Sequence, residues 1–348
     1  MLTALVVVFV LAYAAIALEH PLKINKSASA LVGAGLLWTI YAMSTADHAL
    51  ISHQLGESLM ATAQIAFFLM GAMTIVEVVD AHNGFEVITK RIKTQQLSTL
   101  MWLVGIVTFF LSALLDNLTT TIVMISLMRK LLANHAERLF FAGIIVIAAN
   151  AGGAWSPIGD VTTTMLWIGG QITSINIITS VFLPAVVSLL VPLSITAMML
   201  RGKPVVSPEH IEMDHGLKTS EFERKTMFFL GLGVLIAVPI FKTVTHLPPF
   251  LGILFGLGIV WLVGDLIHRH KEDEYKQRLT LAHALSKIDM SSLVFFIGIL
   301  LAVATLEHTH ILSNLAGWLD KEIGRLDLIV LIIGMVSAIV DNVPLVAA

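Results

Sequence analysis

The chain has no cysteine and few charged residues. None of its 348 residues is Cys, and only 13% are Asp, Glu, Lys or Arg. The absence of cysteine excludes a disulfide framework, a thiolate metal site and a thiol nucleophile. The shortage of charge accompanies 57% hydrophobic residues and a mean hydropathy of +0.88, which is more apolar surface than a soluble core of this size can bury. The composition therefore predicts a protein that resides in a lipid bilayer.

The motifs of nucleotide chemistry and hydrolysis are also missing. The sequence contains no phosphate-binding loop, no dinucleotide fingerprint and no Ser/His/Asp arrangement. An intramembrane enzyme would need a nucleophile or a metal-ligand set, and the sequence supplies neither. We therefore expect no enzyme activity, no cofactor and no nucleic-acid partner, and ATP-driven pumping is disfavoured.

The apolar runs are expected to be helices, because an unclosed chain in lipid can satisfy its backbone polar groups in no other way. Lysine and arginine avoid these runs and gather between them. They occur at 23–26 after the first run and at 90–93 after the third, but not within 44–58 after the second. Since basic loops stay in the cytoplasm, this pattern predicts an N-terminus outside.

Two short stretches of the sequence nearly repeat one another. Residues 112–118 read Ser-Ala-Leu-Leu-Asp-Asn-Leu, and residues 337–343 read Ser-Ala-Ile-Val-Asp-Asn-Val. Each stretch places an aspartate and an asparagine at the end of an apolar run, where a carboxylate is costly to desolvate. The same unfavourable desolvation of an aspartate occurs at matching places in the two stretches. This favours a binding site built from two copies of one structural unit.

The repeats and the alternation of basic loops predict two halves of opposite topology. The expected fold is an all-α membrane protein with inverted-topology repeats, re-entrant helical hairpins and a broken transmembrane helix. By symmetry, about 80 further residues, including a second broken helix, would complete the second half. The expected first repeat is 1–200, with scaffold spans in 1–80, a hairpin in 97–132, a broken helix in 138–170 and a closing span in 175–200; a cytoplasmic linker covers 201–225, and the incomplete second repeat covers 226–348.

Four carboxylates lie within or at the ends of apolar runs that contain no lysine or arginine. A carboxylate in such a place either takes up a proton or binds a mobile cation, and this competition is the basis of cation/proton exchange. Any one of the four is equally consistent with a helix cap or an interface residue, and only the symmetric set favours exchange. The four residues are Glu77, Asp116, Glu307 and Asp341.

Two further features add oxygen ligands near these acids. Asn117 and Asn342 are suited to capping the second helix of each hairpin, a role compatible with ion binding. The segment Asn150–Asp160 contains two glycines and a proline, so we expect it to interrupt the helix and to expose carbonyl groups. Oxygen-rich unwound backbone suits Na⁺ or Li⁺, although a loop between two surface helices is an alternative.

Three stretches resemble the NhaD-type sodium/proton antiporters of the ion transporter superfamily: Gly71–Asp80, Ser112–Thr121 and Asn150–Thr164. The resemblance implies inverted repeats, a scaffold part that forms a homodimer, and secondary exchange of Na⁺ or Li⁺ against H⁺. With it we expect an integral protein of a bacterial inner (plasma) membrane.

The candidate residues fall into two groups. Those expected to bind the ion or proton are Asp116, Asn117, Asn150, Asp160, Thr162, Asp341 and Asn342, with Na⁺ or Li⁺ held by Asp116, Asn117, Asn150, Asp341 and Asn342. Those expected to form a proton pathway or to tune the site are Glu77, Asp80, His82, Glu307 and His308. The alternatives are another carrier of the superfamily, for arsenite or a dicarboxylate, or a structural membrane subunit. Aspartates at the hairpin tips argue against a dicarboxylate, because they repel an anion.

Overall fold

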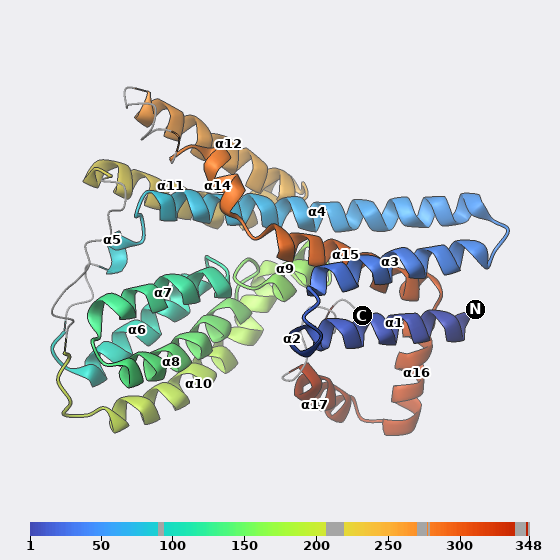
Figure 1. Ribbon diagram of the computed structural model, residues 1–348, viewed down its shortest axis with the longest axis horizontal. Helices are drawn as coiled ribbons and strands as arrows, with labels where there is room; N and C mark the ends of the chain where they lie inside the picture. The colour runs from blue at the N-terminus through green and yellow to red at the C-terminus, as the bar shows by residue number, and fades with distance from the viewer. Residues whose placement is uncertain (90–93, 207–218, 270–276, 278, 338–345, 347–348) are drawn as a thin grey trace. The chain divides into compact units, whose positions relative to one another are not determined.

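The computed structural model is helical over almost all the residues that it describes, which are 1–89, 94–206, 219–269, 277, 279–337 and 346 (Figure 1). Within these ranges no β-strand forms, and the extended pairing is an isolated bridge between Gln96 and Pro204. The helices are α1 Leu2–Ala17, α2 Glu19–Leu22, α3 Lys26–Met43, α4 His48–Ala81, α5 Glu86–Thr89, α6 Leu97–Ser112, α7 Asn117–Leu131, α8 His135–Ala154, α9 Val161–Ile168, α10 Ser174–Met199, α11 Glu221–Thr245, α12 Pro249–His268, α14 Leu281–Lys287, α15 Met290–His308, α16 Ile311–Ile323 and α17 Leu326–Ser337.

Six helices of the described part are long and apolar enough to cross a bilayer. They contain between 19 and 34 residues, and about 20 residues of helix span a hydrocarbon core of ~30 Å. The prediction of an all-α membrane protein is therefore confirmed. The six helices are α4, α8, α10, α11, α12 and α15.

Helix α4 differs from the sequence prediction at its N-terminal end. We expected 44–58 to be a loop, but α4 begins at His48 and continues for 34 residues. The Asp47 carboxylate accepts a hydrogen bond from the Leu50 N–H at 3.0 Å and so starts the helix, and no proline or glycine follows until Gly56. Hydropathy did not predict that α4 begins at His48, because the residues of its first turns are polar. At 1.5 Å per residue, α4 is about 50 Å long and exceeds the hydrocarbon core.

The chain forms two compact units, each described by itself. The first contains residues 1–69 and 289–348, and in it α1 and α15 pack against α3 (Figure 1). A Cβ atom on Gly298 would lie 2.9 Å from the Ala30 backbone, so the glycine allows α15 to approach α3 closely. The Trp38 indole N–H also donates to the Leu301 carbonyl at 2.9 Å. Segments distant in sequence thus share one core.

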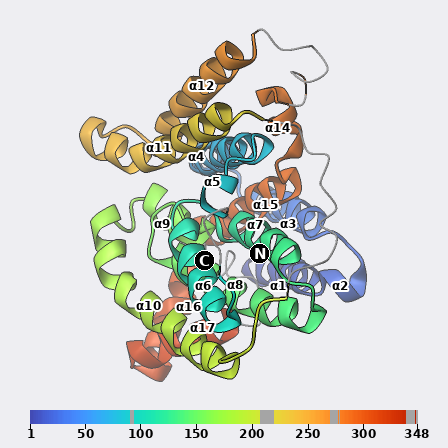
Figure 2. The same cartoon turned by 90° about the vertical axis from the view of Figure 1, so that its left-hand side faces the viewer.

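The second unit contains residues 70–288. Helices α6, α7, α8 and α10 pack together around buried side chains such as Val104, Phe141 and Leu193. Helices α11 and α12 lie side by side as an antiparallel pair (Figures 1 and 2). A division into two compact units does not show that two halves of the sequence are related by symmetry. The predicted inverted repeats therefore stay a prediction.

The segment after α10 is bonded to the ends of the hairpin helices. The Leu97 N–H donates to the Lys203 carbonyl at 3.0 Å, and the Val205 N–H donates to the Gln95 carbonyl at 2.9 Å. The Ala133 N–H donates to the Val206 carbonyl at 2.9 Å. These bonds fix the start of α6 and the turn after α7 with respect to α10. The first residues of the predicted linker are therefore part of the fold of the second unit.

Candidate ion-binding site

The first predicted hairpin is formed by α6 and α7, with Asp116 at the turn between them. Asp116 has an extended backbone and is the N-cap of α7. Its carboxylate accepts hydrogen bonds from the Thr119 N–H at 2.8 Å and from the Thr119 hydroxyl at 2.6 Å. The expectation that Asn117 caps this helix is wrong, because the extended residue that accepts the capping bond is Asp116. The Asn117 side chain is thereby left for another role.

That role is to join the hairpin to the interrupted helix. The Asn117 Nδ2 group donates to Asn150 Oδ1 at 3.0 Å and to Asp160 Oδ2 at 2.8 Å. Asn150 lies on α8, and Asp160 lies directly before α9. Three of the predicted residues, Asn117, Asn150 and Asp160, are therefore brought together from α7, from α8 and from the segment before α9, and Asp116 precedes Asn117 directly in the chain.

The interruption between α8 and α9 is shorter than we predicted. Helix α8 continues through Gly152 and Gly153 to Ala154, so Asn150 is a helical residue. The expectation that the whole of Asn150–Asp160 is irregular is wrong, because glycine weakens a helix without ending it when the helix is packed. The irregular segment is 155–160, where Pro157 removes a backbone donor.

Asp160 closes this segment as the N-cap of α9. Only 8% of its surface is exposed, and its Oδ1 accepts hydrogen bonds from the Thr162 N–H at 2.8 Å and from the Thr162 hydroxyl. Three carbonyl groups of the segment already accept hydrogen bonds: that of Ser156 from the Thr163 hydroxyl at 3.0 Å, that of Asp160 from the same hydroxyl at 2.9 Å, and that of Pro157 from the Thr164 hydroxyl at 3.1 Å. A cation would therefore be bound by side-chain oxygens more readily than by these three carbonyl oxygens.

Close packing at glycines holds the hairpin against the interruption. A Cβ atom on Gly152 would lie 2.1 Å from the Phe109 carbonyl oxygen, and one on Gly159 would lie 2.5 Å from the Ser112 carbonyl oxygen. The Ser112 hydroxyl donates to the Ala149 carbonyl at 2.6 Å. Backbone meets backbone at these points, so the positions of Asp116 and Asp160 are fixed by the main chain.

A carboxylate that accepts hydrogen bonds can still bind a cation. An ionised carboxylate has about four lone-pair directions. Both Asp116 oxygens and both Asp160 oxygens accept bonds from neighbouring groups, and the donors named above leave further lone pairs on each carboxylate. Carboxylate and carboxamide oxygens are the ligands that hard cations prefer. The arrangement is therefore chemically suited to a small cation or a proton as substrate.

Glu77, Asp80 and His82 lie near the end of α4, in the second unit. Asp80 and Lys287 are the charged neighbours of Glu77. Lys287 belongs to α14, far from Glu77 in the sequence, so the apolar run around Glu77 gave no sign of this positive charge. The buried His82 ring contacts His268, and their Nε2 atoms are 3.2 Å apart.

Glu307 and His308 end helix α15, in the first unit. His308 Nε2 lies 2.9 Å from the Ser58 hydroxyl, and its ring centroid lies 6.0 Å from that of Trp38. Glu307 is exposed. Asp341 and Asn342 lie outside the described residues, so their pairing with Asp116 and Asn117 stays a prediction.

Sequence reasoning missed Lys242, which is on α11 near its C-terminal end. Its Nζ donates to the Trp167 carbonyl at 2.6 Å and lies 4.5 Å from the centroid of the Trp167 ring. Trp167 belongs to the last turn of α9, so a cation satisfies the C-terminal end of the same short helix that Asp160 caps. A single lysine at the end of an apolar run is typical of a residue at the membrane interface. The sequence therefore did not indicate that Lys242 contacts α9.

The fold and this polar cluster define an integral membrane transporter. A family model described as citrate transporter matches residues 7–348, and the chain belongs to this family. The chain is 48% identical over 346 residues to sodium/proton antiporter 1 of Arabidopsis thaliana, covering 99% of this chain and 59% of that relative. It is 44% identical over 342 residues to sodium/proton antiporter 2 of the same plant, covering 98% and 80%.

A bacterial relative is more distant. The chain is 28% identical over 373 residues to the Na⁺/H⁺ antiporter NhaD of Vibrio cholerae, covering 99% of this chain and 76% of that relative. The resemblance to NhaD-type antiporters that the motifs indicated is confirmed.

Proposed function

We propose that this protein is a secondary transporter that exchanges Na⁺ or Li⁺ for H⁺, with cation and proton competing for the carboxylates of Asp116 and Asp160. The observation that carries the proposal is the Asn117 bridge, which joins the Asn117 carboxamide to the Asn150 carboxamide and to the Asp160 carboxylate, next to Asp116 in the chain. The names of the plant and bacterial relatives support sodium and protons as the substrates. Since the chain spans 59% of the first relative, the activity is proposed for the whole protein.

The proposed cycle follows from the chemistry of the cluster. An empty site would leave two carboxylates close to one bridging amide, and like charges favour uptake of a proton or a cation. A cation bound by these oxygens would displace the proton, which would leave to the opposite side when the site reopens there. Thr162 would orient Asp160, and Glu77, with its neighbours Asp80 and Lys287, would tune proton access.

Several finer features of the proposal rest on the sequence. We infer that Asp341 and Asn342 complete the site, that Glu307 and His308 act as the counterparts of the α4 residues, and that two copies associate through the scaffold helices. The exposed apolar side chains of the spanning helices are suited to contact with lipid. An N-terminus outside the cell follows from the distribution of basic residues.

A direct exchange assay tests the proposal. Proteoliposomes that contain the full chain and a trapped pH indicator are acidified inside, and Na⁺, Li⁺ or K⁺ is added outside. We expect alkalinisation of the lumen with Na⁺ and Li⁺ that saturates with concentration. The absence of any cation-dependent proton movement would reject the proposal.

Citrate is the second candidate substrate, and the description of the family model favours it. The cluster opposes it, because a citrate anion would meet the Asp116 and Asp160 carboxylates. Uptake of radiolabelled citrate in the same proteoliposomes separates the two substrates. Saturable citrate uptake without cation-dependent proton movement would select the citrate carrier.

Replacing Asn117 with alanine is expected to raise the KM for sodium about thirtyfold. The change removes the two bonds from Nδ2, which together are worth ~2 kcal/mol. The initial rate of exchange measured against sodium concentration checks this. Asn176→Ala is the matched control, because that side-chain amide accepts a local bond from the Ser180 hydroxyl at 2.9 Å. Equal KM values for both variants would contradict the role of the bridge.

A further inference from the structure

A threonine hydroxyl next to the polar cluster is buried and makes no hydrogen bond. Thr120 lies near the start of α7, and none of its surface is exposed. Its Oγ1 atom has no hydrogen-bond partner within the part of the chain that the structure describes. Buried polar groups in proteins are almost always bonded, because an unpaired hydroxyl in the interior costs stability. The Thr120 hydroxyl is therefore free to bind a ligand.

The two neighbouring threonines show that the segment itself does not prevent bonding. The Thr119 hydroxyl donates to the Asp116 carboxylate at 2.6 Å, and the Thr121 hydroxyl donates to the Asn117 carbonyl at 2.7 Å. Both of these threonines are only half-buried. The most buried of the three hydroxyls is thus the one without a partner, which is the opposite of what stability alone requires.

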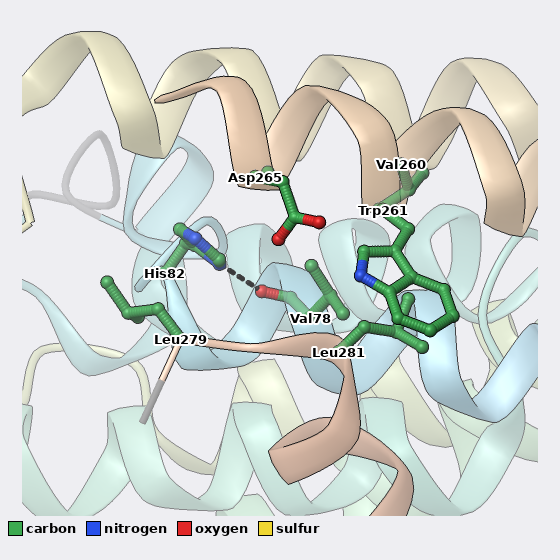
Figure 3. Close-up of a pocket in the computed structure, with 8 residues that line it drawn as sticks. Val78, His82, Val260, Trp261, Asp265, Leu279 and Leu281 are labelled. Atoms are coloured by element: carbon green, nitrogen blue, oxygen red, sulfur yellow. Dashed lines mark hydrogen bonds between the residues drawn. The ribbon is translucent and has the colours of Figure 1, made fainter. Parts of the chain in front are cut away.

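Two other buried polar side chains of the second unit are bonded within their own helices. The Thr108 hydroxyl on α6 is as deeply buried as that of Thr120, and it donates to the Val104 carbonyl at 2.6 Å. Figure 3 shows the buried His82 imidazole on α4, whose Nδ1 atom lies 2.6 Å from the Val78 carbonyl oxygen. A bond to the preceding helical turn is therefore available to a buried side chain in this unit, and the Thr120 hydroxyl does not make it.

The position of Thr120 on α7 directs its side chain to the candidate ion-binding site. Thr120 follows Asp116 by four residues and Asn117 by three, so the three side chains share one side of the helix start. Side chains of an α-helix lean towards its N-terminal end and cover the preceding turn. The turn that Thr120 covers contains the N-cap Asp116 and also Asn117, which bridges to Asn150 and Asp160.

We propose that the Thr120 hydroxyl is a further ligand of the transported cation. This proposal rests on the proposed function, because it adds a residue to the same site. A hydroxyl oxygen carries two lone pairs, and its hydrogen can rotate away from a bound cation. Neutral oxygens of this kind complete the ligand shell of a hard cation without adding further negative charge.

Binding of a cation would remove the cost of the buried hydroxyl. Na⁺ or Li⁺ needs several oxygen ligands at once, and the carboxylates of Asp116 and Asp160 supply the negative charge. The cation gains a neutral ligand from Thr120, and the hydroxyl gains the partner that it otherwise lacks. The protein without the cation is less stable for the same reason, as is common where a binding site is optimised for function.

The experiment compares Thr120→Val with the parent protein in the proteoliposome exchange assay and in detergent. Valine has the shape of threonine without the hydroxyl, so it removes both the ligand and the unpaired oxygen. We expect the KM for sodium to rise about tenfold, because a charged partner loses one polar contact. The melting temperature without sodium should stay equal or rise. A purely structural role of Thr120 would not raise the KM while stability is kept.

Three further variants make the comparison specific to the hydroxyl. Thr120→Ser retains the hydroxyl and should keep a KM near that of the parent. Thr120→Ala also lacks the hydroxyl, and it repeats the test if valine disturbs the turn. Thr108→Val is the matched control, because the Thr108 hydroxyl is equally buried but bonded, and its KM should stay unchanged. A parental KM in both variants that lack the hydroxyl, or equal increases in Thr120→Ser and Thr120→Val, would overturn the proposal.

The direction of the KM change separates a cation ligand from a group that serves only the proton. Proton and cation compete for the same carboxylates in the proposed exchange. A variant that weakens proton binding would therefore lower the KM for sodium, whereas loss of a cation ligand raises it. A lower KM in Thr120→Val would overturn the assignment of Thr120 to the cation.

Sodium binding is also measured without transport, as the rise of the melting temperature with sodium concentration in detergent. A sodium-dependent rise that is reduced in Thr120→Val, in a chain without exchange activity, would reject the transport function and keep Thr120 as a cation ligand. Normal exchange with a parental KM in Thr120→Val and Thr120→Ala would overturn the role of Thr120 and keep the transport function.

Discussion

Replacing Asp116 with asparagine is expected to abolish cation-dependent proton movement and to leave the fold intact. Asparagine is as good an N-cap as aspartate, so the bond from the Thr119 N–H to the side-chain oxygen is retained. The variant loses the negative charge and one acceptor oxygen. Removing one charged partner from a poorly solvated site costs ~3 kcal/mol, which corresponds to about a hundredfold loss of rate or affinity. Exchange in proteoliposomes measures this loss.

The matched control for Asp116→Asn is Asp289→Asn. Asp289 caps α15 with the same pattern, accepting from the Ser292 N–H and from the Ser292 hydroxyl, but it is exposed. Both variants therefore change the same cap chemistry, and only one changes the candidate site. We expect similar melting temperatures for the two variants and near-normal exchange for Asp289→Asn. Full activity of Asp116→Asn would remove Asp116 from the site.

Hydropathy predicted most helices because lipid selects long apolar runs. The predicted hairpin in 97–132 contains α6 and α7, Leu97–Ser112 and Asn117–Leu131. The helical segments that hydropathy did not predict share one property, which is that they contain many polar residues. The first turns of α4 from His48 and the two-faced helix Ile311–Ile323 have too many polar residues for a hydropathy signal, although their backbones are regular. Composition reports which residues favour lipid, whereas helix boundaries depend on caps and packing.

The residues of the candidate site were identifiable from the sequence, but their partners were not. An aspartate and an asparagine at the end of an apolar run are costly, and this cost identified Asp116 and Asn117. Asp116 is the cap because its backbone is extended. The sequence does not reveal this, since aspartate and asparagine are equally favoured as caps. The Asn117 bridge to Asn150 and Asp160 needs the backbone approach of Ser112 to Gly159, which only three-dimensional packing provides.

A second close approach between main chains, that of Phe109 to Gly152, leads to the other large effect, which is expected for Gly152→Ala. The added methyl group would lie 2.1 Å from the Phe109 carbonyl oxygen, far inside van der Waals contact. The neighbour is main chain of α6, so it cannot rotate away as a side chain can. Overpacking of this kind costs ~3 kcal/mol or more. We expect a marked fall in the melting temperature in detergent and the loss of exchange, since α6 must move away from α8.

The same helix supplies the control for Gly152→Ala. Gly143 is also on α8, and a Cβ atom there would meet no atom within 4 Å. Alanine is the better helix former by ~1 kcal/mol, so Gly143→Ala should keep or raise the melting temperature. If alanine lowers the melting temperature at position 152 and keeps or raises it at position 143, the loss at 152 comes from the close approach of the two backbones and not from helix propensity. If Gly152→Ala were as stable as Gly143→Ala, the hairpin would not be held by contact between main chains, and the positions of Asp116 and Asp160 would need another cause.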